Sequence, residues 1–352
     1  MNTAKKCPAL RHAVVAAIAL ASVVAVAFMP STASAAQFNH LVVFGDSLTD
    51  VGNLAQADGG LLPGPLSNYA PGMFTDGSAT TPSTKILGNY AYQLNSALGF
   101  STLAPSTTGG TDYSYGGAIT GGSQTLDSVN IPGMQAQVDS FINSSPTDPA
   151  GNLYLLWGGA NDILNAAEAS GATATSINGA ATTAANNVYG EINTLYQAGA
   201  RDFIWLNLPN LALTPEGSGL STAADLTTAI SDFNSSFNQY VGAIESGVFP
   251  GMKIDAVDVS TLFNSLVSDP GKYGFTNVTG SAQGQTGVNP DQYLFWDGLH
   301  PTTAADKFLV SQTISGVDTT FFNSTPEPAS WMLLLAAGAG AAAVSRRRRN
   351  RV

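Results

Sequence analysis

The feature that most constrains the fold is an alternation of short apolar runs with longer amphipathic stretches. The runs are rich in β-branched and aromatic residues, which predicts buried parallel strands. They lie at residues 40–44, 153–157, 203–206 and 254–259. The stretches between them carry apolar residues at helical spacing. The expected helices include residues 188–196, 226–244 and 302–314. This alternation predicts a three-layer α/β/α sandwich with a mainly parallel central sheet.

The N-terminal segment is predicted to lie outside this fold. Residues 1–35 contain three basic residues, an apolar stretch at 13–29 and a small-residue cleavage site that ends at Ala35. This pattern is typical of a secretory signal peptide, and the alternative is a retained membrane anchor. Cys7, the single cysteine, lies inside the segment. The mature body is therefore expected to be stabilised without disulfides.

The C-terminal segment, 326–352, has a similar three-part organisation. Pro326-Glu327-Pro328 precedes an uncharged stretch at 329–345, and a cluster of arginines follows. A helix over this stretch would span roughly 26 Å, which just reaches across a bilayer, with the arginines on the cytoplasmic side. The segment resembles the PEP-CTERM sorting tail, which implies processing by an exosortase-like enzyme and an association with exopolysaccharide systems. The alternative is a plain single-pass anchor. Together the two ends predict an exported protein that is secreted or held at the cell surface, with a transient C-terminal anchor.

The body between these segments, residues 36–325, is predicted to be one domain. It carries 5 basic and 23 acidic residues, a net charge of about −18. Such a surface repels nucleic acid and anionic membranes, so neither is an expected partner. With two histidines and no cysteine in the body, a zinc or iron site is not expected, and no phosphate-binding glycine-rich loop is present. We therefore predict no metal and no cofactor.

Ser47 follows the first predicted strand, in "LVVFGDSLTDVGN". Ligands bind at the carboxyl ends of parallel strands, so a hydroxyl here would lie where a substrate binds. A serine nucleophile needs a base, and His300 is the candidate because His40 lies at the opposite end of the same strand. In "FWDGLHP", Asp297 lies three residues before His300 and can orient its imidazole. Taken alone, an Asp-x-x-His pair is more often a capping turn.

Two further turns can supply oxyanion donors. In "YLLWGGANDIL", Asn161 follows a predicted strand and can offer a side-chain N–H to the crevice that holds Ser47. In "DYSYGGAIT", Gly116 and Gly117 can bring backbone N–H groups close to a ligand. Each turn taken alone is an ordinary loop pattern.

In order and spacing, these four stretches resemble the four blocks of the GDSL, or SGNH, hydrolase family, across roughly residues 38–316. The resemblance implies a flavodoxin-like SGNH-hydrolase fold. It also implies roles: Ser47 is the nucleophile and an oxyanion donor, Gly117 and Asn161 complete the oxyanion hole, His300 is the base, and Asp297 orients it. Asp112 stands where the glycine block usually has Asn, so Gly116 remains an alternative to Gly117.

The expected function is a serine esterase or lipase that hydrolyses acyl esters of lipids or acylated small molecules. The stretches "LPNLALTP" and "YGFTNVT" are similar to the secreted lipolytic branch of the family. One alternative is a carbohydrate esterase that deacetylates an acylated exopolysaccharide, in keeping with the sorting tail. A second is a catalytically inactive matrix-binding protein.

Overall fold

A computed structural model describes residues 38–64, 68–77 and 88–322 of the chain. The predicted signal peptide, residues 1–35, and the predicted sorting tail, residues 326–352, lie outside this part. Among the described residues, none of the helices combines the length and the apolar character that a bilayer span requires.

The central sheet consists of four parallel strands in the order β1-β6-β7-β8. Their bounds are β1 Leu41–Gly45, β6 Leu153–Trp157, β7 Asp202–Leu206 and β8 Lys253–Val257. Each coincides with a predicted apolar run to within two residues. β8 ends before the predicted Val259, because the Asp258 side chain accepts from Thr261 N (3.0 Å) and starts the next helix.

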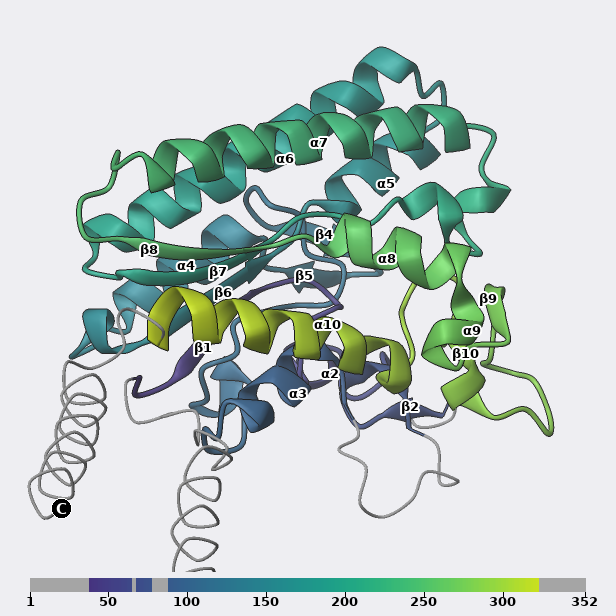
Figure 1. Ribbon diagram of the computed structural model, residues 1–352, viewed down its shortest axis with the longest axis horizontal. Coiled ribbons are helices and arrows are strands. Elements are labelled where there is room, and N and C mark those ends of the chain that lie inside the picture. The colour runs from purple at the N-terminus through teal and green to yellow at the C-terminus, as the bar shows by residue number, and fades with distance from the viewer. Residues whose placement is uncertain (1–37, 65–67, 78–87, 323–352) are drawn as a thin grey trace, which may run out of the picture. The chain divides into compact units, whose positions relative to one another are not determined.

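Helices cover both faces of the sheet, so the predicted three-layer α/β/α architecture is confirmed (Figure 1). On one face, α6 (Ala174–Gln197) and α7 (Ala223–Glu245) pack side by side, with α5 (Ala160–Glu168) at their end. On the other face, α3 (Tyr90–Ala97) lies beside α10 (Thr303–Val317). The helix α4 (Met134–Asn143) contacts α6 and β1. The strands are buried on both faces, which explains why they read as continuous apolar runs.

An irregular fifth strand lies along the free edge of β1. Val43 N donates to the carbonyl of Thr111 (3.0 Å), and Tyr113 N donates back to the carbonyl of Val43 (2.8 Å). Tyr115 N continues the ladder to the carbonyl of Gly45 (3.2 Å). This parallel pairing brings the glycine turn after Tyr115 to the edge of the sheet where Ser47 follows β1.

The described parts of the Gly-, Ser- and Thr-rich stretches near 55–82 and 101–130 contain short elements of secondary structure. The helix α2 is Asn53–Ala57. One hairpin joins β2 (Tyr69–Ala70) to β3 (Met73–Asp76), and another joins β4 (Gln124–Leu126) to β5 (Val129–Ile131). These strands are two to four residues long, too short to produce a readable alternation of apolar and polar residues.

The region after β8 forms a second, smaller apolar core. It contains α8 (Val259–Ser268), α9 (Pro270–Tyr273) and the parallel strands β9 (Asn277–Ser281) and β10 (Tyr293–Phe295). Leu266, Phe275, Leu294, Phe295 and Ala305 form the buried centre of this cluster. It connects the end of β10 to the turn that carries Asp297 and His300.

Candidate active site

Ser47 lies immediately after β1, where the strand ends against its neighbour. A Cβ atom at Gly45 would stand 2.5 Å from the carbonyl oxygen of Trp157 and 2.4 Å from Thr49 Oγ1, so glycine is required there. The amide of Gln137, on α4, donates to the Gly45 carbonyl and accepts from the Gly45 N–H, both at 2.9 Å. The strand end is thus held from both sides, and Ser47, at 6% exposure, is presented from a rigid position.

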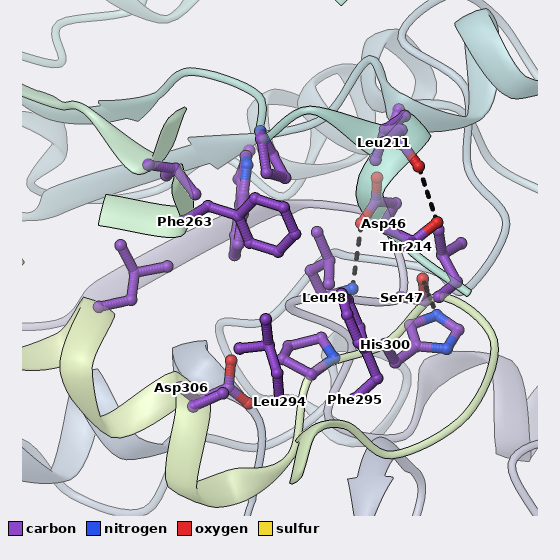
Figure 2. Close-up of a pocket in the computed structure, with 18 of the residues that line it drawn as sticks. Asp46, Ser47, Leu48, Leu211, Thr214, Phe263, Leu294, Phe295, His300 and Asp306 are labelled. Carbon is purple, nitrogen blue, oxygen red and sulfur yellow. Dashed lines mark hydrogen bonds between the residues drawn. The ribbon is translucent and has the colours of Figure 1, made fainter. Parts of the chain in front are cut away.

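His300 and Asp297 meet Ser47 in a hydrogen-bonded series. His300 Nε2 lies 2.7 Å from Ser47 Oγ (Figure 2), and His300 Nδ1 lies 2.7 Å from Asp297 Oδ2. The structure therefore brings together residues that are 253 positions apart in the chain.

The carboxylate of Asp297 is held by its own turn. Its Oδ1 accepts from the backbone N–H groups of Leu299 (2.8 Å) and His300 (2.7 Å). Burial raises the pKa of Asp297, but the charge of His300 and these hydrogen bonds outweigh burial and hold the pKa well below its usual range. Asp297 is thus an ionised acceptor that holds a proton on His300 Nδ1, which leaves Nε2 to face Ser47.

The β2–β3 hairpin adds two side chains that the sequence did not reveal. Tyr69 OH donates to Asp297 Oδ2 at 2.7 Å, and the Phe74 ring lies 4.8 Å from the imidazole of His300 between centroids. Burial and the negative charge of Asp297 raise the pKa of Tyr69, so its hydroxyl keeps its proton. The hairpin therefore packs against the Asp297–His300 pair.

Three N–H groups at this edge are available as donors. Within the described part of the chain, neither Ser47 N nor Gly117 N donates to another group. Asn161, in the first turn of α5, donates one amide hydrogen to the Ala118 carbonyl (2.9 Å) and has a second one left. Gly117 has φ +77°, a conformation that favours glycine. These three donors match the residues predicted for an oxyanion hole.

Asp50 distinguishes the two candidate glycines by their hydrogen bonds. Its Oδ2 accepts from Gly116 N at 2.8 Å and from Leu54 N at 3.1 Å, and its Oδ1 accepts from Gly52 N and Asn53 N, both at 2.7 Å. Because the Gly116 N–H is engaged, Gly117 is the glycine whose N–H is free. Asp50 also ties the loop after Ser47 to the glycine turn.

Asp112, the departure from the family pattern, lies beside this network. Its carboxyl oxygens accept from Val51 N (2.8 Å) and Ser114 N (3.0 Å). Complete burial and the neighbouring Asp50 raise the pKa of Asp112 well above its usual range. A neutral Asp112 is closer in charge to the asparagine usual at this place than an ionised one would be.

Two cavities meet at Ser47, and both include Asn161, Leu299 and His300 in their walls. The narrower one has a volume of about 70 Å³ and extends between α8, β10 and α10. Its other walls are mostly apolar, with Trp157, Pro209, Leu211, Val259, Leu262, Phe263, Leu266, Leu294, Phe295, Pro301, Ala305 and Leu309. The wider one has a volume of about 460 Å³ and is bordered by the exposed side chains of Leu61, Leu62 and Leu126.

Comparisons with known proteins identify the family of this chain. The model of the GDSL-like lipase/acylhydrolase family matches residues 41–312, and the PEP-CTERM protein-sorting motif matches residues 324–349. An uncharacterised protein from the trpE-trpG intergenic region of Pseudomonas putida is 29% identical over 88% of this chain. This chain spans only 52% of that relative's length.

Other relatives have named activities. A GDSL esterase/lipase of Arabidopsis thaliana is 26% identical over 77% of this chain and 86% of its own length. The thermolabile hemolysin of Vibrio parahaemolyticus is 22% identical over 79% of this chain and 63% of its own. Among solved structures, a putative GDSL-like lipase from Parabacteroides merdae has a TM-score of 0.40 at 10% identity, covering 80% of this chain and 96% of its own. Because the family model covers most of the chain, this protein belongs to the GDSL-like lipase/acylhydrolase family and carries a C-terminal PEP-CTERM sorting motif.

Proposed function

We propose that the protein is a serine ester hydrolase in which Ser47 is the nucleophile, His300 the general base and Asp297 its orienting acid. The observation that carries this proposal is the unbroken series of contacts from Ser47 Oγ through the imidazole to Asp297, each at 2.7 Å. This series places a proton acceptor against the hydroxyl and a fixed anion behind the acceptor, which is what activation of a serine requires.

The reaction proceeds in two halves. Ser47 Oγ attacks the ester carbonyl carbon while His300 Nε2 takes the hydroxyl proton, and the oxyanion accepts from Ser47 N, Gly117 N and Asn161 Nδ2. His300 then returns the proton to the alkoxide, the alcohol leaves, and the acyl group stays on Ser47. Water attacks this acyl-enzyme with His300 again as base, which releases the carboxylic acid and restores the serine.

The proposed substrates are acyl esters of lipids or acylated small molecules. Two cavities with mostly apolar walls on either side of Ser47 support this proposal, because they offer separate places for the acyl and alcohol parts. The alternative is deacetylation of an exopolysaccharide, which only the sorting motif favours. The contact between Ser47 and His300 speaks against an inactive matrix-binding protein, since binding alone needs no such contact.

The sorting motif also supports a proposal for location. The protein would be exported and then secreted or kept at the cell surface. An exosortase-like enzyme would process the C-terminal segment, which would serve as a transient anchor until then.

A fluorophosphonate probe and an ester panel test the proposed activity together. The probe reacts with activated serines, so it should label the protein and should fail to label Ser47→Ala. Nitrophenyl esters from acetate to palmitate should be hydrolysed. If acetate is released from acetylated xylan while every ester longer than acetate is left intact, the carbohydrate esterase is the correct function instead.

A further inference from the structure

The far wall of the narrow cavity carries one acidic side chain, Asp306. Among the described residues, the other polar side chains of the wall are Asp46, Ser47, Asn161 and His300 at the Ser47 end, and Thr214. The Thr214 hydroxyl already donates to the Leu211 carbonyl (2.8 Å). Asp306 comes from α10 and lies beside Leu294, away from Ser47 and His300 (Figure 2). A carboxyl group therefore stands at the distant end of an otherwise apolar cavity.

Asp306 has no partner for its buried oxygen. The side chain is 3% exposed, and its Oδ2 makes no hydrogen bond within the described part of the chain. Burial and the nearby Asp76 raise the pKa of Asp306 well above its usual range, so the carboxyl is neutral and can both donate and accept. A buried polar group without a partner costs on the order of 1–3 kcal/mol, which calls for an explanation.

The neighbouring polar groups are engaged only in part, since Asp76 Oδ2, like Asp306 Oδ2, is buried without a hydrogen bond in the described part of the chain. Asp76 Oδ1 accepts from Thr303 N (2.6 Å) and from the Thr303 hydroxyl (2.5 Å). The hydroxyls of Tyr90 and Thr313 bond to each other at 2.9 Å. Asp306 also lines the narrow cavity, so a partner for its carboxyl can come from a bound molecule there.

The narrow cavity suits the acyl part of the substrate, given the function proposed above. The alcohol must depart while the acyl group is still bound to Ser47, and water must then enter. The wider cavity, about 460 Å³ against 70 Å³, provides that route. Since a water-sized group needs roughly 15 Å³ of such space, the narrow cavity accepts a short chain of about five groups.

We propose that the acyl chain carries a hydroxyl group at its far end and that Asp306 binds this hydroxyl. Leu294, Leu309 and Phe263 contact the methylene groups, while the carboxyl of Asp306 supplies the hydrogen bond that an apolar wall cannot. The substrate class is therefore an ester of a hydroxyalkanoic acid of short to medium length.

The test compares nitrophenyl esters of plain and terminally hydroxylated acids, from four to ten carbons. The wild type should prefer the hydroxylated ester at one chain length by roughly 10- to 100-fold in kcat/KM. Asp306→Leu should abolish this preference and increase hydrolysis of the plain ester of that length. Asp306→Asn keeps a hydrogen-bond donor and an acceptor, so it should retain most of the preference. It keeps the test informative if Asp306→Leu does not fold.

The control is a substitution in the wall of the narrow cavity that replaces one apolar side chain with another. Leu309→Val should alter kcat/KM of the plain and hydroxylated esters by the same factor. If Asp306→Leu also changes both esters by one factor, or if the wild type prefers the hydroxylated ester at no length, the hydroxyl site is wrong while ester hydrolysis stands. If the wild type hydrolyses no ester at all, the proposed function is overturned and this inference with it.

Discussion

The hydroxyl of Tyr69 donates to Asp297 Oδ2, the same oxygen that lies against His300 Nδ1, and both distances are 2.7 Å. Together with the two backbone donors to Oδ1, this gives the carboxylate four donors. A buried carboxylate stays ionised only when its oxygens are satisfied in this way. In the proposed mechanism, Tyr69 is therefore a positioning residue, which acts on the imidazole through Asp297.

Tyr69→Phe should slow hydrolysis without weakening substrate binding. The variant keeps the ring contacts to Phe74 and Trp296 and loses only the hydroxyl. A hydrogen bond to a charged group contributes roughly 1.5–3 kcal/mol, so we expect kcat to fall about tenfold or more with KM unchanged. Steady-state kinetics and thermal unfolding of Tyr69→Phe would check this. If the variant is less stable but has a normal kcat, the role of Tyr69 is purely structural.

Ser47→Ala and His300→Ala should each reduce ester hydrolysis by several orders of magnitude and leave the fold intact. Both residues serve one proton transfer, so the double variant should be no slower than either single variant. Activity assays with circular dichroism spectra of the three variants decide the matter. Near wild-type turnover in His300→Ala would show that another group is the base.

Asn161→Ala should lower kcat by roughly 10²- to 10³-fold with little change in KM, because one oxyanion donor is lost. The variant also loses the bond to the Ala118 carbonyl, so a stability loss alone would not be informative. Asn95→Ala is the matched control, since Asn95 Nδ2 donates to the Ser101 carbonyl (2.6 Å) on another loop. The control should lose stability and keep its turnover per folded molecule.

Stability should fall as the pH rises from about 4 to 7. Burial raises the pKa of Asp46 to about 7 and of Asp255 to about 6, so over this window the folded protein binds more protons than the unfolded chain. Asp297, whose pKa is lowered, works in the opposite direction only below about pH 4. Thermal unfolding should therefore give a higher midpoint at pH 5 than at pH 8.

Asp255→Asn tests the cause of that slope. Asp255 Oδ2 is buried without a partner in the described part of the chain, and burial is the cause of its raised pKa. The variant should gain about 1–2 kcal/mol at pH 8 and much less at pH 5. Glu245→Gln, at an exposed position, should shift neither value. Equal gains at both pH values would mean that Asp255 acts through packing.

The sequence was sufficient for the sheet and for the residues around Ser47. Parallel strands buried on both faces appear in the sequence as continuous apolar runs. The strands β1, β6, β7 and β8 lie where those runs predicted them. Residues that follow such strands meet at one edge, which is why Ser47 and Asn161 could be grouped in advance. The difference between the Gly116 and Gly117 N–H groups needed the structure, because it depends on the carboxylate of Asp50.

Tyr69 and Phe74 could not be found from the sequence. The strands of their hairpin are too short to show an alternation of apolar and polar residues. Tyr69 also contacts Asp297 across 228 positions of the chain. No local propensity encodes such a contact, because it exists only when the hairpin docks on the turn after β10. The unpaired oxygen of Asp306 could not be predicted for the same reason, because it depends on how side chains distant in the sequence, such as Asp76, pack around it.

The meeting of the two cavities at Ser47 has a consequence for how the proposed esterase activity can diversify. Among the described residues, Ser47, Asn161, Leu299 and His300 are the ones that both walls share. In the proposed reaction, a substitution in α8 or α10 would therefore alter the acyl group that is accepted, and a substitution near Leu62 or Leu126 would alter the alcohol group. Acid preference and alcohol preference can be inherited, lost or engineered as two independent traits.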